Sequence, residues 1–234
     1  MAIYKGNKKV VAVYKGSTPI NKIYKGSTLV FQKGGGGGGS THLIEGTATG
    51  NFSMSINDYQ TIHITPDASG KWFFDTDEKI TSLYHCFYRL SAVTSVDLSN
   101  LDLTGIETVG MFLMCSNIVS IKFNNTKIME LIKMSSMFSS CKSLTSLDLS
   151  SFDTSNTSNI FSLFKNCSSL VSLILSNFDM SKATSYSDMF YNCSKLTHIT
   201  CKQAFKDWCI TNQDEIKLPT AMREGGSGTW EIIG

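Results

Sequence analysis

Apolar residues recur at fixed positions between Leu83 and Cys201, where one stretch of sequence repeats with a period of 26 residues. The repeated unit is Met-Phe-x-x-Cys-x-x-Leu-x-x-Leu-x-Leu-Ser, and its cysteines are Cys115, Cys141, Cys167 and Cys193. A degenerate first copy places Leu90 at the cysteine position, 25 residues before Cys115. Five copies at one period predict a repeat architecture in which each unit stacks on its neighbours.

Within one unit, the alternation of apolar and polar residues predicts a short strand. In Leu147-Asp148-Leu149 the leucines face inward and Asp148 faces outward. The Met-Phe-x-x-Cys-x-x-Leu part has three- and four-residue spacing, which predicts a helical turn with one face on the core. Stacked units bury a continuous apolar column and align their strands in a narrow parallel sheet. The predicted fold class is an α/β leucine-rich-repeat-like solenoid of about five 26-residue coils with β caps, preceded by a small all-β meander.

These repeats resemble the leucine-rich-like repeats of the BspA-type surface-protein family, whose units have the pattern M-F-x-x-C-x-x-L-x-x-L-D-L-S-x-F-D-T-S. The stretch 139–155 follows this pattern nearly throughout, and the resemblance covers about half of the chain. It implies a repeat fold and a role in surface adhesion and partner binding, without a defined chemistry. The second copy has Ile121-Lys122-Phe123-Asn124 in place of L-D-L-S, which argues against a uniform ligand-binding face.

Residues 1–33 carry a second, shorter repeat, in which Ile/Val-Tyr-Lys-Gly recurs every 10 residues with tyrosines at Tyr4, Tyr14 and Tyr24. β-branched and aromatic residues leading into Gly-Ser or Gly-Asn predict short strands joined by tight turns. Such a meander is too short to bury a core alone. We expect it to dock as an anchor on another protein, on another copy of itself or on the rest of the chain. A small free-standing β module is an alternative that stays open.

The tandem Ile-Tyr-Lys-Gly-Ser-Thr segments resemble segments near the ends of structural proteins of tailed phages that infect gut Bacteroidales. The resemblance implies a virion protein. The start of the chain lacks the apolar core and cleavage site of a secretory signal peptide, and a virion protein reaches the outside by cell lysis.

A polyglycine segment at 34–40 separates this anchor from the rest of the chain. Six consecutive glycines predict a flexible linker, which is either a native hinge or a cloning linker. The following residues, 41–80, are expected to form a β cap on the first coil of the solenoid at 81–201, because open ends of stacked repeats need covering.

Three strands are expected within the β cap, at 51–56, 61–65 and 71–74, because their residues alternate between turn signals. Residues 202–234 are expected to form the C-terminal cap. Its helix is predicted at 203–210 from the apolar spacing, and its strand at 229–233.

The seven cysteines are expected to be buried thiols. Four occupy equivalent repeat positions, and Cys86 and Cys201 fall at apolar positions of their own copies. Free cysteine behaves as a small buried hydrophobic side chain. Disulfide bridges between neighbouring coils and metal ligation stay open as alternatives, although no Cys-x-x-Cys pair with zinc-ligand spacing occurs.

Composition and charge exclude some classes of binding partner. The net charge is +2 and only 17% of residues are charged, with lysine and arginine dispersed, so no nucleic-acid partner is expected. No apolar run approaches about 18 residues, so we expect no membrane insertion.

The sequence contains no recognisable catalytic pattern. His-x-x-x-His, Gly-x-Ser-x-Gly and phosphate-loop patterns do not occur, so we expect no enzyme activity and no cofactor. Acidic residues recur at one repeat position, each followed two residues later by a hydroxyl: Asp102 with Thr104, Asp153 with Ser155, and Asp179 with Ser181. These pairs are expected to close turns. A calcium-binding column is the alternative, although calcium needs more oxygen ligands than the pattern guarantees.

The outward strand positions form the candidate recognition face, represented by Asp97, Lys122, Asp148, Ile174 and His198. This face lacks the aromatic residues expected of a sugar-stacking site and the charge stripe expected of a polyanion site. A merely solvated sheet surface is the alternative.

The sequence therefore predicts a non-enzymatic phage virion protein, such as a head or tail fibre or decoration at the virion surface. Residues 1–33 would bind other virion proteins, the solenoid would bind a bacterial surface protein or glycan, and the undersized anchor favours a homo-oligomer. The alternative is a bacterial cell-surface adhesion module of the BspA type. A hydrolase acting on surface glycans would need paired carboxylates in a definable cleft, which the sequence does not provide.

Overall fold

The computed structural model describes residues 4–5, 8–9, 22–25, 28–32, 44–56, 60–74, 80–99, 101, 103–106, 108–123 and 133–234. Within these residues the strands form two sheets of four strands and three sheets of two strands. One α-helix, α1 (Gln203–Thr211), and one 3-10 helix, η1 (Thr220–Met222), lie near the C-terminus. Among all the described residues, no helix has the length and the apolar character that a membrane span requires.

The predicted fold class, an α/β leucine-rich-repeat-like solenoid, is wrong. The regular secondary structure of the described chain is mostly strand, in several small sheets, and its one α-helix, α1, follows the last repeat instead of recurring in each unit. The Met-Phe-x-x-Cys segments, predicted to be helical turns, are successions of tight turns.

Left-handed backbone conformations prevent these segments from forming a helix. Two residues in each repeat have a φ between 51° and 64°: His85, Gly110, Ser136, Ser162 and Asp188 before the Met-Phe position, and Arg89, Met114, Ser140, Asn166 and Asn192 before the cysteine position. A right-handed helix cannot pass through such residues. Gly110, Asp188, Asn166 and Asn192 are of the residue types that adopt this region at the lowest cost, whereas the other six positions carry residues for which it is less favourable.

Alternate amides of the turns bond to the next repeat. The amides of Phe112, Phe138 and Phe164 donate to the carbonyls of Met137, Leu163 and Met189 at 2.9, 3.1 and 2.9 Å. The intervening amides close local turns; the Cys141 amide, for example, donates to the Phe138 carbonyl at 3.1 Å. Every second amide therefore bonds a carbonyl of the next repeat, and these bonds form a second ladder between repeats. The three- and four-residue spacing of apolar side chains, which is typical of a helix, here belongs to a chain of turns that makes this ladder.

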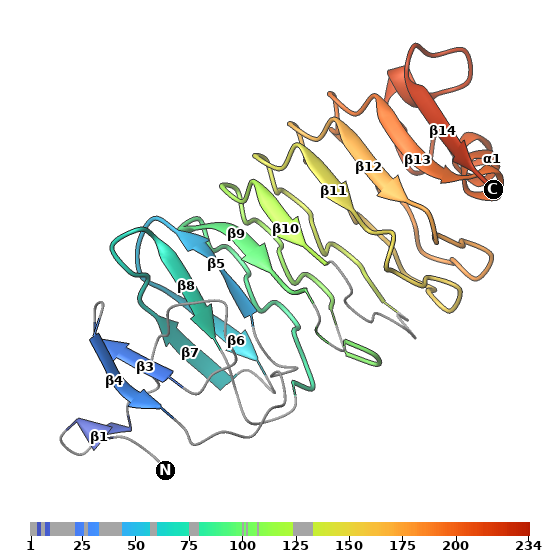
Figure 1. The fold of residues 1–234 in the computed structure, drawn as a ribbon. Helices are drawn as coiled ribbons and strands as arrows, with labels where there is room; N and C mark the ends of the chain where they lie inside the picture. The colour runs from blue at the N-terminus through green and yellow to red at the C-terminus, as the bar shows by residue number, and fades with distance from the viewer. Residues whose placement is uncertain are drawn as a thin grey trace.

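The strand segments of successive repeats follow one another in a row (Figure 1), and within each of two sheets neighbouring repeats pair in parallel. β11 (Ser146–Asp148), β12 (Ser172–Leu175), β13 (His198–Lys202) and β14 (Thr229–Ile233) form one sheet in that order. Its register places Leu147 beside Leu173 and Leu173 beside Ile199, so equivalent residues of neighbouring repeats are adjacent. β14 confirms the strand predicted at 229–233.

The first two repeats contribute to a second four-stranded sheet, with the order β10-β9-β5-β8. β10 (Ser120–Lys122) pairs in parallel with β9 (Val93–Asp97). β5 (Ile44–Ala48) is antiparallel both to β9 and to β8 (Lys71–Phe74), so residues before the repeats cover the outer edge of β9. β6 (Phe52–Ile56) and β7 (Gln60–Ile64) form a hairpin. The strands predicted between residues 51 and 74 are thereby confirmed to within one residue.

A column of phenylalanine rings runs through the interior of the repeats. Phe87, Phe112, Phe138, Phe164 and Phe190 stack with centroid separations of 5.1, 5.9, 5.7 and 5.6 Å. The rings are within 13° of parallel, and all five are fully buried. Burial of each ring contributes about 1.5–3 kcal/mol, and each aromatic contact adds about 0.5–1.5 kcal/mol. This column is a principal stabilising contact between repeats.

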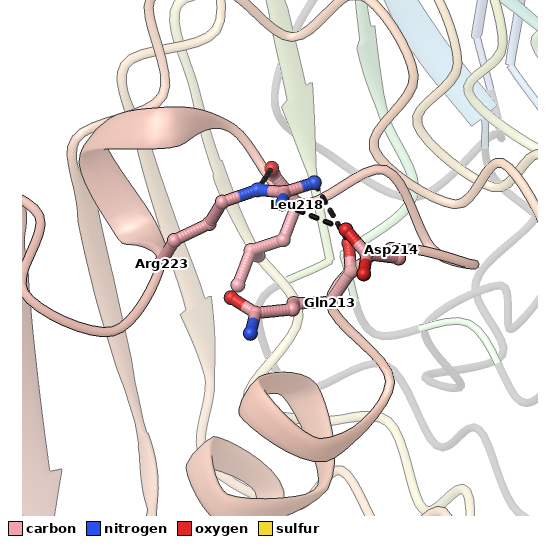
Figure 2. A network of polar contacts seen from close by, with 4 residues as sticks. All are labelled: Gln213, Asp214, Leu218 and Arg223. Carbon is pink, nitrogen blue, oxygen red and sulfur yellow. Dashed lines mark hydrogen bonds and ion pairs between the residues drawn. The ribbon is translucent and has the colours of Figure 1, made fainter.

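The chain after β13 covers the end of the stack. α1 buries Phe205 and Cys209, and the Phe205 ring meets Phe178 edge-on at 5.7 Å. In the loop that leads to β14, Arg223 donates from Nε to the Leu218 carbonyl at 2.9 Å and from Nη1 to Asp214 at 2.7 Å (Figure 2). The helix predicted at 203–210 is confirmed.

At the N-terminus, two antiparallel strand pairs are described. β1 (Tyr4–Lys5) pairs with β2 (Lys8–Lys9), and β3 (Lys22–Lys25) pairs with β4 (Thr28–Gln32). Tyr4 and Tyr24 of the predicted anchor lie in β1 and β3. Tyr14 and the predicted linker at 34–40 lie outside the described residues.

Candidate functional site

The outward side chains of the parallel strands stand in two rows. The register joins Ser146, Ser172, His198 and Thr229 in one row, and Asp148, Ile174, Thr200 and Glu231 in the other. In the sheet of the first repeats, Ser95 pairs with Ser120 and Asp97 with Lys122. Four of the five predicted recognition residues, Asp97, Lys122, Asp148 and Ile174, therefore occupy equivalent positions in the second row. His198 belongs to the first row, beside Ser172, and Thr200 occupies the second-row position in the last repeat.

Asp97 and Lys122 form the charged end of this face. The Lys122 ammonium lies 3.7 Å from the Asp97 carboxylate, and 58% of the lysine side chain is exposed. On the other side of Asp97, Glu45 of β5 is its register partner. Partial burial and the Asp97 charge together raise the pKa of Glu45 above its ordinary value. A long, exposed ion pair of this kind contributes at most about 1 kcal/mol to stability, so it leaves Lys122 available to a partner.

Asp148 is held in place by a local turn. Its Oδ1 accepts a hydrogen bond from the Ser150 amide at 2.8 Å, as Asp97 does from the Ser99 amide at 2.9 Å. Asp153 and Asp179 accept from the Ser155 and Ser181 amides in the same way. The hydrogen bonds from the hydroxyl and amide of Ser155 lower the pKa of Asp153. The prediction that the Asp-x-Ser pairs close turns is thus confirmed for these two pairs, whereas Asp102 lies outside the described residues.

The sheet is interrupted between β10 and β11, although these strands are consecutive in the stack (Figure 1). In the intact ladders, the Val119 amide bonds the Thr94 carbonyl and the Leu149 amide bonds the Ile174 carbonyl, at 2.8 and 2.9 Å. Across the interruption, two equivalent bonds are missing among the described residues. The Thr145 amide does not bond the Val119 carbonyl, and the Phe123 amide does not bond the Asp148 carbonyl. One side-chain bond crosses there, from the Ser151 hydroxyl to the Phe123 carbonyl at 3.4 Å.

A hollow of about 240 Å³ opens at this interruption. We call it the β10–β11 hollow; Ile121, Phe123 and Leu147 form its apolar floor, and Val119, Ser120, Lys122, Ser146, Asp148, Ser172 and Ile174 form its rim. The floor residues are buried, whereas Lys122, Ser146 and Asp148 are exposed. Its volume is below the usual range of about 300–1,000 Å³ for small-molecule pockets, so it accommodates a single small group.

Phe123 accounts for the interruption. It stands where the other repeats carry Leu98, Leu149, Leu175 and Cys201. Its ring packs edge-on against Phe152 at 4.9 Å and against Phe138 at 6.3 Å. A ring needs more room than a leucine side chain in a close-packed interior, and we attribute the separation of β10 from β11 to this larger side chain.

The four repeat cysteines are fully buried, and their thiols are free. Each thiol donates to the carbonyl of the phenylalanine 28 or 29 residues earlier: Cys115 to Phe87, Cys141 to Phe112, Cys167 to Phe138 and Cys193 to Phe164, at 2.7, 3.2, 3.1 and 3.0 Å. Burial raises the pKa of Cys115 and of Cys193 to about 12. These thiols are therefore protonated donors that join repeats.

Among the described residues, no group of three or more His, Cys, Asp or Glu side chains lies close enough to hold a metal ion. His198 bonds the Thr197 hydroxyl through Nδ1 at 2.8 Å, and His63 bonds Ser53 at 2.7 Å. The feature with the clearest capacity to bind a partner is thus the strand face with the β10–β11 hollow. The sequence signals the hollow only through the departure at 121–124.

The model of one protein family matches residues 81–208, more than half of the chain. This family is described as "Mycoplasma protein of unknown function, DUF285". No curated protein and no solved structure matches the chain.

Proposed function

The chain belongs to the DUF285 family, and we propose that its repeats form a non-enzymatic binding module displayed at a bacterial or phage surface. The strand face of β9 to β13 is the surface that meets the partner, and the partner is a component of a bacterial cell surface. The N-terminal Tyr-Lys-Gly repeats attach the module to the structure that carries it.

The observation that carries this proposal is the mixed character of the strand face. Ile174 is 36% exposed beside its register partner Asp148, and Val119 and Val171, directly before β10 and β12, are 55% and 39% exposed. The charged Lys122 ends β10. Exposed apolar side chains rimmed by polar ones are typical of surfaces that bind other macromolecules. Rigid, stacked repeats hold such side chains at fixed spacing, which lowers the conformational entropy lost on binding.

Two settings are compatible with this activity. A phage virion protein, with residues 1–33 bound to the particle, is supported by the resemblance of the tandem Ile-Tyr-Lys-Gly-Ser-Thr segments. A cell-surface adhesion module of the BspA type is supported by the family match over the repeats. Antibodies against the full chain distinguish them: labelling of intact virions supports the first setting, and labelling of intact cells the second. Labelling that requires lysis of both would contradict surface display.

Adsorption of the fluorescently labelled full chain to intact host cells tests the binding face. We expect the double variant Val171→Asp/Ile174→Asp to bind at least about tenfold more weakly, because it places two carboxylates in the apolar part of the face. Tyr191→Asp is the matched control, since Tyr191 is 44% exposed but lies on the turns. Equal loss in both variants, or in neither, would show that the strand face is not the binding surface.

A further inference from the structure

We propose that the β10–β11 hollow binds an extended peptide segment of a protein partner. The segment seats one small aliphatic side chain on the apolar floor and aligns its backbone with the interrupted ladder. This inference rests on the proposed function, because it specifies where on the strand face the partner is held and which class of molecule the partner is.

The backbone groups left without a partner between β10 and β11 favour a peptide as the ligand. The Phe123 amide is a donor and the Asp148 carbonyl is an acceptor, both belong to residues that line the hollow, and no bond joins them. Between the other repeats the same two groups bond each other, as the Leu98 amide does with the Lys122 carbonyl at 2.9 Å. A peptide unit supplies the complementary acceptor and donor. A strand seated between β10 and β11 needs them about 9.6 Å apart, whereas their Cα atoms approach within 8 Å, so the strand side opens as the peptide enters.

The floor and rim define the rest of the segment. Ile121, Phe123 and Leu147 lie beneath the hollow, and the exposed Val119 and Ile174 border it. The hollow of about 240 Å³ therefore offers apolar contacts to a side chain of the size of valine. On the rim, the hydroxyls of Ser120, Ser146 and Ser172 can donate to or accept from further peptide groups.

The charged side chains on the rim restrict the composition of the segment. Lys122 and Asp148 stand on opposite sides of the interruption, and both are exposed. A segment with an acidic residue on the β10 side and a basic residue on the β11 side complements them. A glycan fits this site less well, because Phe123, the one aromatic residue that lines the hollow, is only 3% exposed and offers no open face on which a sugar could stack.

Two capped pentapeptides test the inference on the full chain. Thr-Thr-Val-Thr-Thr carries the aliphatic anchor and Thr-Thr-Gly-Thr-Thr lacks it; binding is followed by the amide signals of Phe123 and Lys122 in nitrogen-15 NMR spectra. We expect the valine peptide to shift these signals with a dissociation constant of about 1 mM, and the glycine peptide to bind at least about fivefold more weakly. Equal binding of both peptides, or no shift with either, would overturn the proposal. N-acetylglucosamine shifting the same signals while the peptides do not would assign the hollow to glycans.

Two variants locate the site. Ser146→Trp fills the hollow and is expected to abolish the peptide-dependent shifts, whereas His198→Trp adds the same bulk to the same row outside the hollow and leaves them unchanged. Phe123→Leu provides a second variant that does not depend on an added ring. It is expected to join β10 to β11, seen as slower exchange of the residue 123 amide, and to remove peptide binding. Peptide binding that persists in the variant with a joined sheet would contradict the proposal.

The same variants separate this inference from the proposed function. If Ser146→Trp leaves adsorption of the full chain to cells unchanged while Val171→Asp/Ile174→Asp abolishes it, the strand face binds cells and the hollow does not hold the partner. If the unaltered chain fails to adsorb to cells while the valine peptide still binds, the proposed surface function fails and the peptide site stands.

Discussion

The thiol of Cys167 donates a hydrogen bond to the carbonyl of Phe138 at 3.1 Å, across 29 residues of sequence. That carbonyl also accepts from the Cys141 amide within its own repeat. A small apolar side chain with a weak donor fits this place, which explains why cysteine recurs there at a 26-residue period.

Replacing Cys167 with alanine tests this explanation. The variant loses the donor and leaves a void beside the fully buried Phe138, so we expect the free energy of unfolding to fall by about 1–3 kcal/mol. Urea unfolding followed by circular dichroism measures the change. Lys195→Ala, at an exposed site in the next repeat, is the control and should stay within about 0.5 kcal/mol of the unaltered chain. A cost for Cys167→Ala no larger than that of the control would show that the thiol has no stabilising role.

The buried thiols make the fold sensitive to alkali. Burial raises the pKa of Cys201 to about 11 and that of Cys115 and of Cys193 to about 12, from an ordinary value of 9.0. Above pH 9 the unfolded chain loses thiol protons that the folded chain keeps, so stability is complete below pH 9 and falls as the pH rises toward 11–12. We expect a loss of up to about 1.4 kcal/mol per pH unit for each such thiol.

Urea unfolding at pH values between 8 and about 10.5 measures this dependence. Cys201→Val removes one titrating thiol and should make the decline less steep. An unchanged slope in that variant would exclude a contribution from Cys201. Native thiols should also resist iodoacetamide at pH 8, because the thiolate is the reactive form.

Gly46 lies where β5 passes closest to its neighbours. A Cβ atom at this position would collide with the Ser95 carbonyl oxygen and lie 2.9 Å from Cζ2 of Trp72. Gly46→Ala is therefore expected to lower the free energy of unfolding by about 3 kcal/mol, because the pairing of β5 with β9 has to shift. At Gly50, an added Cβ meets no atom within 4 Å. Gly50→Ala in the same thermal unfolding measurement should be nearly neutral, and equal costs for the two variants would refute the argument from close packing.

Arg223 stabilises the C-terminal loop mainly through a backbone contact. Its Nε donates to the Leu218 carbonyl, whereas its ion-pair partner Asp214 is 87% exposed (Figure 2). We expect Arg223→Ala to cost about 2 kcal/mol and Asp214→Ala less than about 0.5 kcal/mol. Hydrogen exchange of the β14 amides should rise in the first variant only. A larger effect of Asp214→Ala would mean that the ion pair is the principal contact.

The sequence predicted the strands well because a two-residue alternation has one structural meaning. Asn51–Ile56 and Thr229–Ile233 alternate or concentrate β-branched and aromatic residues, and both segments form strands. The C-terminal helix could be predicted equally well, since 203–210 combines helical spacing of apolar residues with residue types that tolerate helical φ and ψ.

The repeat turns were wrongly predicted as helical because three- and four-residue spacing is shared by helices and by successive tight turns. The distinguishing signal lies in residues such as Ser140, Asn166 and Asn192, which adopt a left-handed φ. Small polar residues at this position of the last three repeats favour turns, whereas Arg89 and Met114 at the same position of the first two repeats give no such signal.

The β10–β11 hollow could be anticipated only in part. The replacement of L-D-L-S by Ile121-Lys122-Phe123-Asn124 marked the second copy as irregular. That the irregularity leaves the ladder open depends on the packing of Phe123 against Phe138 and Phe152, which lie in later repeats. Such a three-dimensional arrangement is not encoded in the spacing of one repeat.

The interruption also determines how the molecule can deform. On the turn side, the amides of Gly110, Phe112 and Met114 still bond the carbonyls of Ser135, Met137 and Ser139, so the two halves of the stack remain joined there. On the strand side, no backbone bond between described residues crosses from β10 to β11. Among the described repeats, this junction is therefore expected to bend most easily, and to bend toward opening of the strand side. A partner seated across the junction would stiffen it and fix the curvature of the whole binding surface.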